Sequence, residues 1–416
     1  MSLREEIELL CCNAKSAAAT LALASTKQKN DTLLKIAELL KENIADIIEA
    51  NEKDLANASE NGVPDTMLDR LTLTEARISS ICASLEELTK LDDPVGKGDS
   101  WSRPSGIEIS RIRVPLGVIA IIYEARPNVT VDSAALCLKT GNAVVLRGGK
   151  EAINTNTVLV NVMKRALEEC GFNPHSVGLV LSTERESANI LMNMREYVDV
   201  LIPRGGKGLI KTVTESATVP VIETGAGNCH IYIDESADID MAIKVAINAK
   251  CSRPSVCNAV ETMLVHASIA PKFLPEFEKA AKEFSLDIRG CAKTKVLIPS
   301  AAEATEEDYS TEYNDFILSI KVVNTLSEAI DHINKYSTAH SEAIITNSDD
   351  SANRFLAEVN SAAVYVNAST RFTDGGEFGF GAEIGISTQK LHVRGPMGLM
   401  ALTTEKYLIK GNGTIR

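Results

Sequence analysis

The first 90 residues carry apolar side chains at the spacing of amphipathic helices. In residues 33–48 the apolar positions are Leu33, Ile36, Ala37, Leu40, Ile44, Ile47 and Ile48. Lys and Glu occupy positions between these apolar residues. Residues 92–106 are rich in Gly, Pro, Asp and Ser and are typical of a loop. The apolar positions of residues 107–114 alternate in two halves with a slip of one residue, which predicts a half-exposed strand with a bulge.

From residue 117 onward, short apolar runs alternate with helical stretches. The first series predicts strands at residues 117–122, 143–146, 177–181, 198–202 and 219–222, with helices at 131–139, 155–170, 184–194 and 208–216. The second series predicts strands at residues 260–265, 294–298, 316–323, 341–346 and 363–367, with helices at 238–250, 271–284, 326–336 and 351–358. Strands that alternate with helices form parallel sheets with right-handed crossovers, so the sequence predicts an α/β fold.

The composition limits the classes of function. A chain of 416 residues is long enough for two or more domains. The net charge of -13 argues against nucleic-acid binding, and no apolar run approaches the roughly 18 residues of a membrane span. The first residues lack the basic start and apolar core of a signal peptide, so we expect a cytoplasmic protein. The 9 cysteines and 6 histidines form neither a disulfide framework nor a metal-ligand spacing, and we expect no bound metal.

Cys257 is the first candidate for chemistry. It lies between a predicted helix that ends at residue 250 and a predicted strand that begins near residue 259. A cysteine on a short loop between two rigid elements can be held in place and still be reached by a substrate, as a thiolate nucleophile requires. The alternative is a buried thiol that only packs.

Two segments that follow predicted strands have the residues of a nucleotide site. Arg204, Gly205 and Gly206 follow one strand and open a helix, where backbone N–H groups can bind a phosphate. Arg147 and Lys150 follow another, and basic residues there favour the 2′-phosphate of NADP over NAD. A tight strand-to-helix turn and solvated surface charges are the alternatives.

Two further residues could assist a nucleophile. Asn128 follows the first buried strand, and its amide could join the backbone N–H of Cys257 in an oxyanion hole, although Asn is also a common helix N-cap. Glu223 ends the last strand of the first series and could act as a general base, or it could be a solvated carboxylate at a strand end.

Long blocks of the sequence resemble the γ-glutamyl phosphate reductases, a family in the aldehyde dehydrogenase superfamily. These blocks are residues 114–132, 138–150, 201–206, 253–258, 361–376 and 387–398. The resemblance implies an aldehyde-dehydrogenase-like fold, with two parallel-sheet α/β domains and a small β element for oligomerisation. It implies an NADP(H)-binding domain at residues 1–98 and 117–224, a catalytic domain at 225–400, and oligomerisation strands at 99–116 and 401–416. A homodimer or a higher homo-oligomer is expected.

The resemblance also implies a reaction. The family reduces L-glutamyl 5-phosphate with NADPH to L-glutamate 5-semialdehyde and phosphate in proline biosynthesis, and glutamate 5-kinase, which acts upstream, is a possible partner. Cys257 would form the thioester, assisted by Asn128. Glu223 falls where ordinary aldehyde dehydrogenases have the base that activates water. Because such a base would waste the thioester of a reductase, we expect Glu223 to be turned away, or to have a structural or cofactor-positioning role.

The remaining positions are assigned to ligands by the same resemblance. On the cofactor side, the pyrophosphate would lie by Arg204, Gly205 and Gly206, the adenosine ribose by Arg147 and Lys150, and the nicotinamide ribose by Asp315. For the substrate, the nominated residues are Arg126, Ser369, Thr370 and Arg371.

Three other functions stay open at this point. An aldehyde dehydrogenase that oxidises an aldehyde to a free acid would use Glu223 as its base and would not depend on phosphate. An inactive scaffold or regulatory binding module would not need Cys257, Asn128 and the glycine-rich loops. A cysteine hydrolase would need a histidine partner, and none stands in an evident position.

Overall fold

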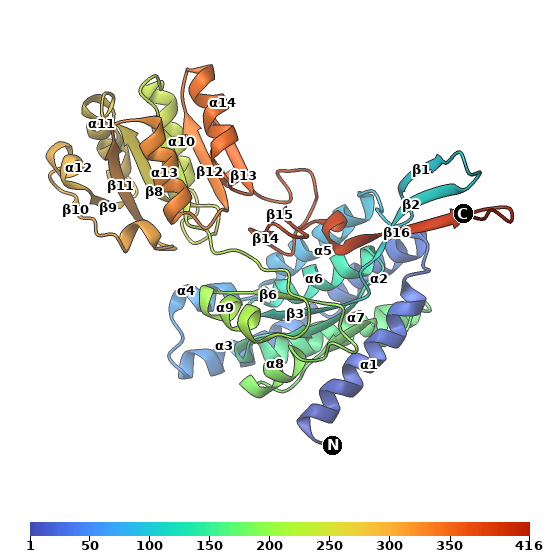
Figure 1. Cartoon of the computed structure of the whole chain (residues 1–416). Coiled ribbons are helices and arrows are strands. Elements are labelled where there is room, and N and C mark those ends of the chain that lie inside the picture. The colour runs from blue at the N-terminus through green and yellow to red at the C-terminus, as the bar shows by residue number, and fades with distance from the viewer. The chain divides into compact units, whose positions relative to one another are not determined.

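The chain divides into two compact units (Figure 1). The computed structural model describes residues 1–416, with the backbone alone at residues 65 and 66. Unit 1 consists of Met1–Thr224, Gly379–Gly385 and Met397–Arg416, and unit 2 of Gly225–Phe378 and Ile386–Pro396. No helix among the described residues is long and apolar enough to cross a membrane.

Unit 1 begins with helices, as the spacing of apolar residues predicts. They are α1 (Leu3–Leu21), α2 (Thr26–Glu42), α3 (Ile44–Glu60), α4 (Asp65–Leu71) and α5 (Glu75–Lys90). Ser2 and Ser25 start α1 and α2 with capping boxes, because each side chain accepts from a backbone N–H three residues on and the residue there bonds back. The apolar faces of α2 and α3 are buried through Leu33, Ile36, Leu40 and Ile47.

A parallel sheet with the strand order β5-β4-β3-β6 lies in unit 1. Its strands are β3 (Val118–Tyr123), β4 (Ala143–Arg147), β5 (Val177–Leu179) and β6 (Val200–Arg204). The connecting helices are α6 (Pro127–Lys139), α7 (Ile153–Glu169), α8 (Arg185–Leu191) and α9 (Lys207–Ser216), with short 3-10 turns η1 (Lys150–Ala152) and η2 (Pro174–Ser176). The strand order reverses between β3 and β6, and the carboxyl ends of strands at such a point are where α/β sheets bind ligands.

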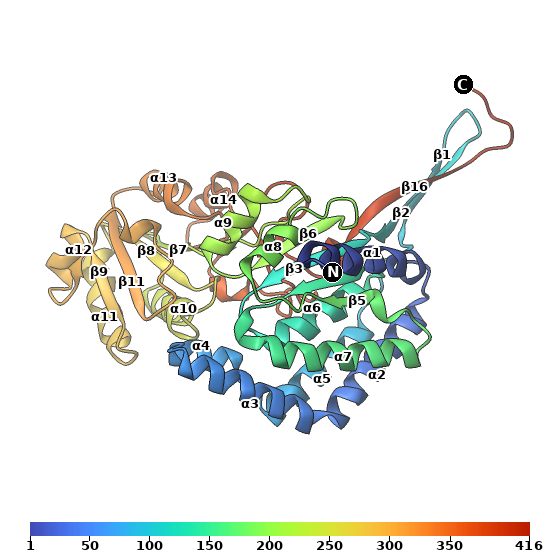
Figure 2. The ribbon, with the colours of Figure 1, turned by 90° about the horizontal axis from the view of Figure 1, so that it is seen from below.

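Three antiparallel strands form an arm of unit 1, in the order β1-β2-β16. They are β1 (Gly98–Ser102), β2 (Glu108–Pro115) and β16 (Thr403–Lys410), and β16 follows the 3-10 turn η5 (Leu399–Leu402). Figures 1 and 2 show that the arm extends away from the helices and the parallel sheet of unit 1. The pairing of β2 with both neighbours is continuous, so the predicted bulge is wrong. Because neither face of β2 is fully buried, its apolar positions need not alternate strictly.

Unit 2 contains a parallel sheet with the strand order β10-β9-β11-β8-β7-β12-β13. Its strands are β7 (Cys229–Ile233), β8 (Val260–His266), β9 (Asp287–Gly290), β10 (Ala302–Glu303), β11 (Ile317–Val323), β12 (Ser341–Ile345) and β13 (Ala363–Val366). Its helices are α10 (Ile239–Cys251), α11 (Ala270–Lys282), α12 (Ala292–Leu297), α13 (Leu326–Tyr336) and α14 (Asp349–Glu358), with 3-10 turns η3 (Asp308–Ser310) and η4 (Thr370–Phe372). A short hairpin pairs β14 (Ile386–Ser387) with β15 (Gly395–Pro396).

Separate apolar cores cover the two faces of this sheet. One contains buried residues of α10 and α11, and the other contains buried residues of α13 and α14. This arrangement of helices on both faces of a parallel sheet confirms the predicted α/β class.

Several predicted elements differ from the structure. Residues 294–298 were expected as a strand, but residues 292–297 form α12, because a short apolar run does not by itself distinguish a strand from a helical turn. Residues 219–222 make one isolated bridge, between Val221 and Leu201, and no full strand. No strand was predicted at β7, β9, β10, β14 or β15. Residues 92–106 were expected as a loop, yet they contain β1, which agrees with the strands expected for oligomerisation at 99–116.

Candidate active site

Cys257 lies on the loop of residues 252–259 that joins α10 to β8, at the amino-terminal end of the sheet of unit 2. It is partly exposed, and none of the 9 cysteines, all of which the structure describes, is part of a disulfide. The position therefore combines a short connection between two rigid elements with access for a substrate, as a nucleophilic thiol requires.

Gly227 holds the backbone of the Cys257 loop in place. A Cβ atom at Gly227 would lie 1.5 Å from the carbonyl oxygen of Cys257 and 2.5 Å from its Cα, so no side chain fits there. The backbone N–H of Gly227 donates to Oε1 of Glu312 at 2.8 Å. Sγ of Cys229 donates to the carbonyl oxygen of Cys257 at 3.2 Å. The segment that leads into β7 thus fixes the path of the loop.

Asn258 joins the same loop to η4. Its Nδ2 donates to the carbonyl oxygens of Arg371 at 3.3 Å and Thr373 at 3.0 Å. Its Oδ1 accepts from Nη1 of Arg371. Its backbone carbonyl accepts from Oγ1 of Thr370 at 2.6 Å. The residue that follows the candidate nucleophile is therefore bound on both sides by one short segment.

Arg371 lies within electrostatic reach of Cys257. Its Nε donates to Oγ of Ser252 at 3.2 Å. Burial and the cation of Arg253 lower the pKa of Arg371, while negative charge at Asp374 and at Cys257 acts in the opposite direction. The structure thus places a partly buried cation against Asn258, the residue that follows the thiol, in the segment that we nominated for the substrate.

Ser369 and Thr370, nominated with Arg371, are both buried. Oγ of Ser369 accepts from the backbone N–H of Arg371 at 3.3 Å, and the hydroxyl of Thr370 donates to the backbone carbonyl of Asn258. In this structure the two side chains shape η4, and their contact with a substrate stays a prediction.

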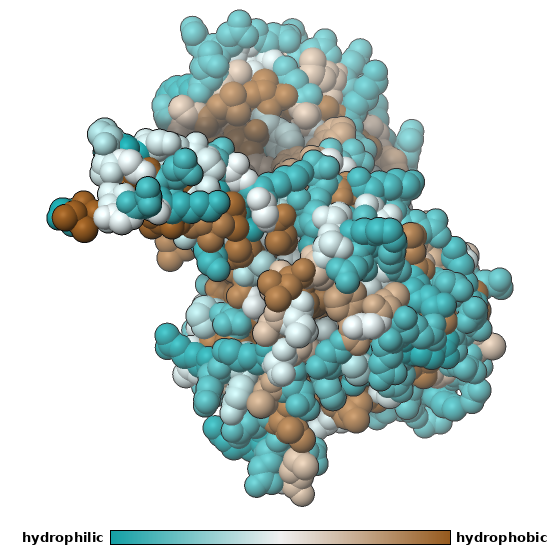
Figure 3. All heavy atoms as spheres, turned by 90° about the vertical axis from the view of Figure 1, so that its right-hand side faces the viewer, coloured by the Kyte–Doolittle hydropathy of each residue, from teal (hydrophilic) through white to brown (hydrophobic). Residues whose placement is uncertain are grey.

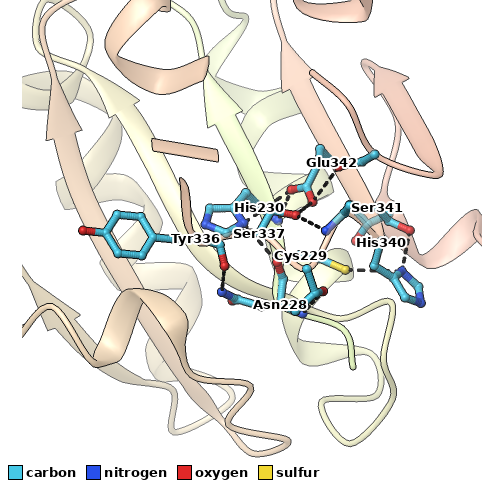
Figure 4. Close-up of polar contacts among 12 residues, drawn as sticks. Asn228, Cys229, His230, Tyr336, Ser337, His340, Ser341 and Glu342 are labelled. Carbon is cyan, nitrogen blue, oxygen red and sulfur yellow. Dashed lines mark hydrogen bonds and ion pairs between the residues drawn. The ribbon is translucent and has the colours of Figure 1, made fainter. Parts of the chain in front are cut away.

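A buried polar network continues behind Cys229 (Figure 4). Nδ1 of His340 lies 3.6 Å from Sγ of Cys229 and 2.8 Å from Oγ of Ser341. Oγ of Ser341 donates to Oγ1 of Thr373 at 2.6 Å, and the carbonyl of Thr373 accepts from Asn258. Together with the bond from Cys229 to the loop, these contacts close a ring of hydrogen bonds around the Cys257 loop.

Glu342 is a buried carboxylate in the same region (Figure 4). Its Oε2 accepts from the backbone N–H of His230 at 2.6 Å, and its Oε1 accepts from Oγ of Ser337. Burial, and secondly the negative charge of Glu342, raise the pKa of the Cys229 thiol well above its ordinary value. Cys229 therefore stays protonated and acts as a hydrogen-bond donor.

A buried ion pair joins the two elements that flank the Cys257 loop. Nζ of Lys250, on α10, lies 2.6 Å from Oε2 of Glu261, on β8, and both side chains are fully buried. Oε1 of Glu261 accepts from the backbone N–H of Asn314 at 3.3 Å. The next residue, Asp315, is exposed and accepts from the backbone N–H of Phe316 at 2.8 Å. Its expected contact with the nicotinamide ribose stays a prediction.

In unit 1, the predicted phosphate turn of residues 204–206 lies at the carboxyl end of β6, beside the end of β3. The backbone N–H of Gly206 donates to Oε1 of Glu124 at 2.9 Å. A Cβ at Gly205 would lie 2.6 Å from the carboxyl carbon of Glu124. The amino end of α9 thus receives a carboxylate in this structure, as an anion-binding helix end does. Glu124 was not predicted, although its place directly after the first buried strand is a signal for it.

Arg147 and Lys150 have different surroundings after β4. The guanidinium of Arg147 donates to the carbonyl oxygens of Thr183 and Glu184, each at 3.1 Å, and its Nε lies 3.4 Å from Oγ of Ser187. Lys150 begins η1 and is exposed. Arg147 therefore holds the turn after β5, and Lys150 is the better placed of the two to meet a phosphate from solvent.

Asn128, Arg126 and Glu223 also lie in unit 1. Arg126 takes the N-cap position of α6, and Asn128 lies in the first turn, so the N-cap alternative for Asn128 is wrong. Nδ2 of Asn128 donates to Oδ2 of Asp132 at 3.2 Å, one helical turn further on. Glu223 is partly exposed and follows the single bridge at Val221. The roles assigned to these residues stay predictions.

Comparison with known proteins agrees with the geometry. Residues 2–296, more than half of the chain, match the model of the aldehyde dehydrogenase family. The γ-glutamyl phosphate reductase of Carboxydothermus hydrogenoformans is 58% identical over 99% of this chain and 100% of its own length. The crystal structure of γ-glutamyl phosphate reductase from Thermotoga maritima is 49% identical with a TM-score of 0.97, and covers 99% of this chain and 100% of that chain. The fold is shared by the crystal structure of an acetylating aldehyde dehydrogenase from Geobacillus thermoglucosidasius. That protein is 16% identical, with a TM-score of 0.72, and the match covers 100% of this chain and 98% of that chain.

The chain therefore belongs to the aldehyde dehydrogenase family, and it is an oxidoreductase of that fold. Within the family, relatives that are 58% identical over 97% or more of the chain are γ-glutamyl phosphate reductases, which confirms the resemblance seen in the sequence blocks.

Proposed function

We propose that the chain reduces L-glutamyl 5-phosphate to L-glutamate 5-semialdehyde and phosphate in proline biosynthesis, with NADPH as the reductant and a thioester on Cys257 as the intermediate. The names of the full-length relatives support the substrate. The observation that carries the chemistry is the setting of Cys257, a partly exposed thiol on a loop fixed by hydrogen bonds, with the Arg371 cation nearby.

The reaction follows from a thiolate at Cys257. The sulfur attacks the acyl carbon, the bond from that carbon to the phosphate oxygen breaks, and phosphate leaves with the electron pair. When bound, NADPH supplies the hydride that reduces the thioester. The tetrahedral group on Cys257 then collapses, the bond from carbon to sulfur breaks, and the aldehyde leaves the regenerated thiolate. We assign Asn128 the role of donating its amide N–H to the oxyanion.

The residues at the carboxyl end of the sheet in unit 1 fit a dinucleotide phosphate. The carboxylate of Glu124 lies against Gly205 and accepts from the N–H of Gly206 at the amino end of α9, and a dinucleotide phosphate would take the place of this carboxylate. Lys150 would meet the 2′-phosphate, while Arg147 shapes the neighbouring turn. Arg204 would flank the pyrophosphate, Asp315 would bind the nicotinamide ribose, and Glu223 would help to position the cofactor.

Cationic and polar groups are proposed for the substrate. Arg371 and Arg126 supply positive charge for its phosphate and carboxylate, and Ser369 and Thr370 hold the segment that carries Arg371. Because acyl phosphates are reactive in water, delivery by glutamate 5-kinase in the cytoplasm would favour the reaction.

We also propose that the arm of unit 1 mediates self-association. Its outer strands β1 and β16 are edge strands, and both are exposed along nearly their whole length. Trp101 and Ile409 are both register partners of Ile109, so the three form an apolar row across the sheet. Trp101 is 40% and Ile409 64% exposed, and Figure 3 shows hydrophobic side chains on the projecting arm at the left of the view. Ile409→Asp should reduce the mass measured by light scattering, and a wild-type monomer would contradict the proposal.

One experiment tests the reaction. Wild type and Cys257→Ala are assayed for reduction of NADP by L-glutamate 5-semialdehyde, with and without phosphate. Wild type should need phosphate, and Cys257→Ala should be inactive. Activity in Cys257→Ala would refute the thioester mechanism, and phosphate-independent formation of free glutamate would favour the alternative aldehyde dehydrogenase with Glu223 as base.

A further inference from the structure

The Cys257 loop begins where a helix end disfavours negative charge. Cys251 is the last residue of α10, and Ser252 is its C-cap. The carbonyl ends of a helix carry partial negative charge, so a thiolate near the C-terminus of α10 is not helped by the helix dipole. Reactive cysteines are commonly found at helix N-termini, where the dipole has the opposite sign. A nearby cation would therefore stabilise a thiolate at Cys257.

Arg371 is in the right place to be that cation. Its guanidinium reaches Oγ of the C-cap residue Ser252 at 3.2 Å and also contacts Oδ1 of Asn258. Both of these acceptors are neutral oxygen atoms, so they orient the guanidinium without cancelling its charge. Burial, and after it the cation of Arg253, lower the pKa of Arg371, while negative charge at Cys257 acts in the opposite direction, and by reciprocity the guanidinium favours a thiolate there.

Asn258 fixes this arrangement. Its amide donates to the carbonyl oxygens of Arg371 and Thr373 and accepts from the guanidinium of Arg371, so both its donor and its acceptor functions are used. Asp could accept from Arg371 but could not donate to the two carbonyls, and Ala could do neither. Because Asn258 follows Cys257 directly, every contact that it makes also limits the position of the thiol.

We propose that Asn258 is a positioning residue that holds the Arg371 guanidinium beside Cys257, and that this cation stabilises the thiolate form of the nucleophile. The inference rests on the proposed role of Cys257. Arg371 acts on the thiol, and Asn258 acts through Arg371.

Two other charged side chains act on Arg371. Arg253 is exposed, so solvent and salt screen its charge, and Asp374, also exposed, opposes the effect. Glu261 and Glu342 lie on β8 and β12 and are fully buried, and their negative charges raise the pKa of Cys229. Lys250 lies 2.6 Å from Glu261, so this buried pair adds little net charge near the Cys257 loop.

The test measures how the reactivity of the Cys257 thiol depends on pH, in the absence of substrate and cofactor. Iodoacetamide alkylation of Cys257 is followed against pH by peptide mass spectrometry, with the partly exposed Cys291 as a reference in the same sample. In Arg371→Met the midpoint for Cys257 should rise by about one pH unit or more, and in Arg371→Lys, which keeps the charge, by less. Asn258→Ala should raise it in the same direction. Arg354→Met, which removes an arginine paired with Glu358 on α14, should leave it unchanged.

A double-mutant cycle decides whether Asn258 acts through Arg371. The combination of Arg371→Met and Asn258→Ala should shift the midpoint no further than Arg371→Met alone. An unchanged midpoint in Arg371→Met, or additive shifts in the double variant, would overturn the proposal. If Arg371→Met does not fold, as judged by circular dichroism, Asn258→Ala carries the test, and an unchanged midpoint in it overturns the proposal. Because alkylation needs no turnover, these results are separate from the activity of Cys257→Ala, which tests the proposed function.

Discussion

Gly227→Ala should disable the enzyme by moving the Cys257 loop, although residue 227 carries no functional group. An added Cβ would lie 1.5 Å from the carbonyl oxygen of Cys257, whereas real Cβ contacts are essentially never under 3.0 Å. The backbone must therefore move by at least 3.0 − 1.5 = 1.5 Å. The obstacle is backbone, so no side-chain rotation relieves it.

The displacement sets the expected magnitudes. A misplacement of about 1 Å at a reacting group can cost about 100-fold in rate, so kcat should fall by about 100-fold or more. Overpacking typically costs about 1–3 kcal/mol, so the unfolding free energy should fall by that amount. The hydrogen bond from Cys229 to the carbonyl of Cys257, at 3.2 Å, should be lost in the same movement.

Two measurements check this reasoning. The rate of NADPH oxidation with L-glutamyl 5-phosphate gives kcat, and urea titration gives the unfolding free energy. The same substitution at Gly208 is the control, since nothing lies within 4 Å of a Cβ there and Ala favours a helix by up to about 1 kcal/mol. A folded Gly227→Ala enzyme with kcat within about twofold of wild type would refute the argument, because the loop would then tolerate displacement.

Four further predictions test other parts of the structure. Glu223→Gln should keep reductive turnover within about tenfold of wild type, because a reductase needs no base to activate water there, and a larger loss in steady-state rate would contradict this. Lys150→Ala should raise KM for NADPH by about tenfold and leave KM for NADH nearly unchanged, whereas equal effects would exclude a contact with the 2′-phosphate. Lys250→Met should lower the unfolding free energy by about 3–5 kcal/mol, since it leaves Glu261 buried without its partner, and adding Glu261→Leu should restore much of the loss in urea titrations. Burial raises the pKa of Asp132 from 3.8 to about 6, so the folded state binds the carboxyl proton more tightly than the unfolded state does. The contribution of Asp132 to the unfolding free energy therefore falls as the pH rises from 3.8 to about 6. Asp132→Asn should lack this fall when the unfolding free energy is measured at both ends of that pH interval.

The fold was predictable where one kind of pattern dominates. The amphipathic spacing of α2 and the wholly apolar run of β3 each favour one structure. β7 was missed because His230 and Tyr232 interrupt its apolar run, although both side chains are fully buried. A polar residue inside a central strand depends on partners elsewhere in the chain, and the carboxylate of Glu342, 112 residues later, bonds to the backbone N–H of His230.

The candidate site was predictable residue by residue but not as an arrangement. Cys257 and Arg371 could be nominated from a loop and from a resemblance, yet the contacts that define their environment join residues far apart in sequence. Asn258 reaches the carbonyl of Arg371 across 113 positions, and no local period reveals such a pair. Gly227 was equally hidden, because the lack of a side chain matters only once the carbonyl of Cys257 is known to lie against it.

The two units use opposite ends of their parallel sheets, and this difference accounts for the need for Arg371. In unit 1, the predicted phosphate turn of residues 204–206 lies at the carboxyl end of β6, where the amino end of α9 supplies a backbone N–H to the carboxylate of Glu124. In unit 2, Cys257 lies at the amino end of β8 and follows the C-terminus of α10, so α10 does not present its amino end to the thiol. A side-chain cation must supply what the backbone supplies in unit 1. Reactivity of Cys257 should therefore depend on one arginine and its orientation, and a substitution that displaces Arg371 should harm the thiol as much as one that removes it.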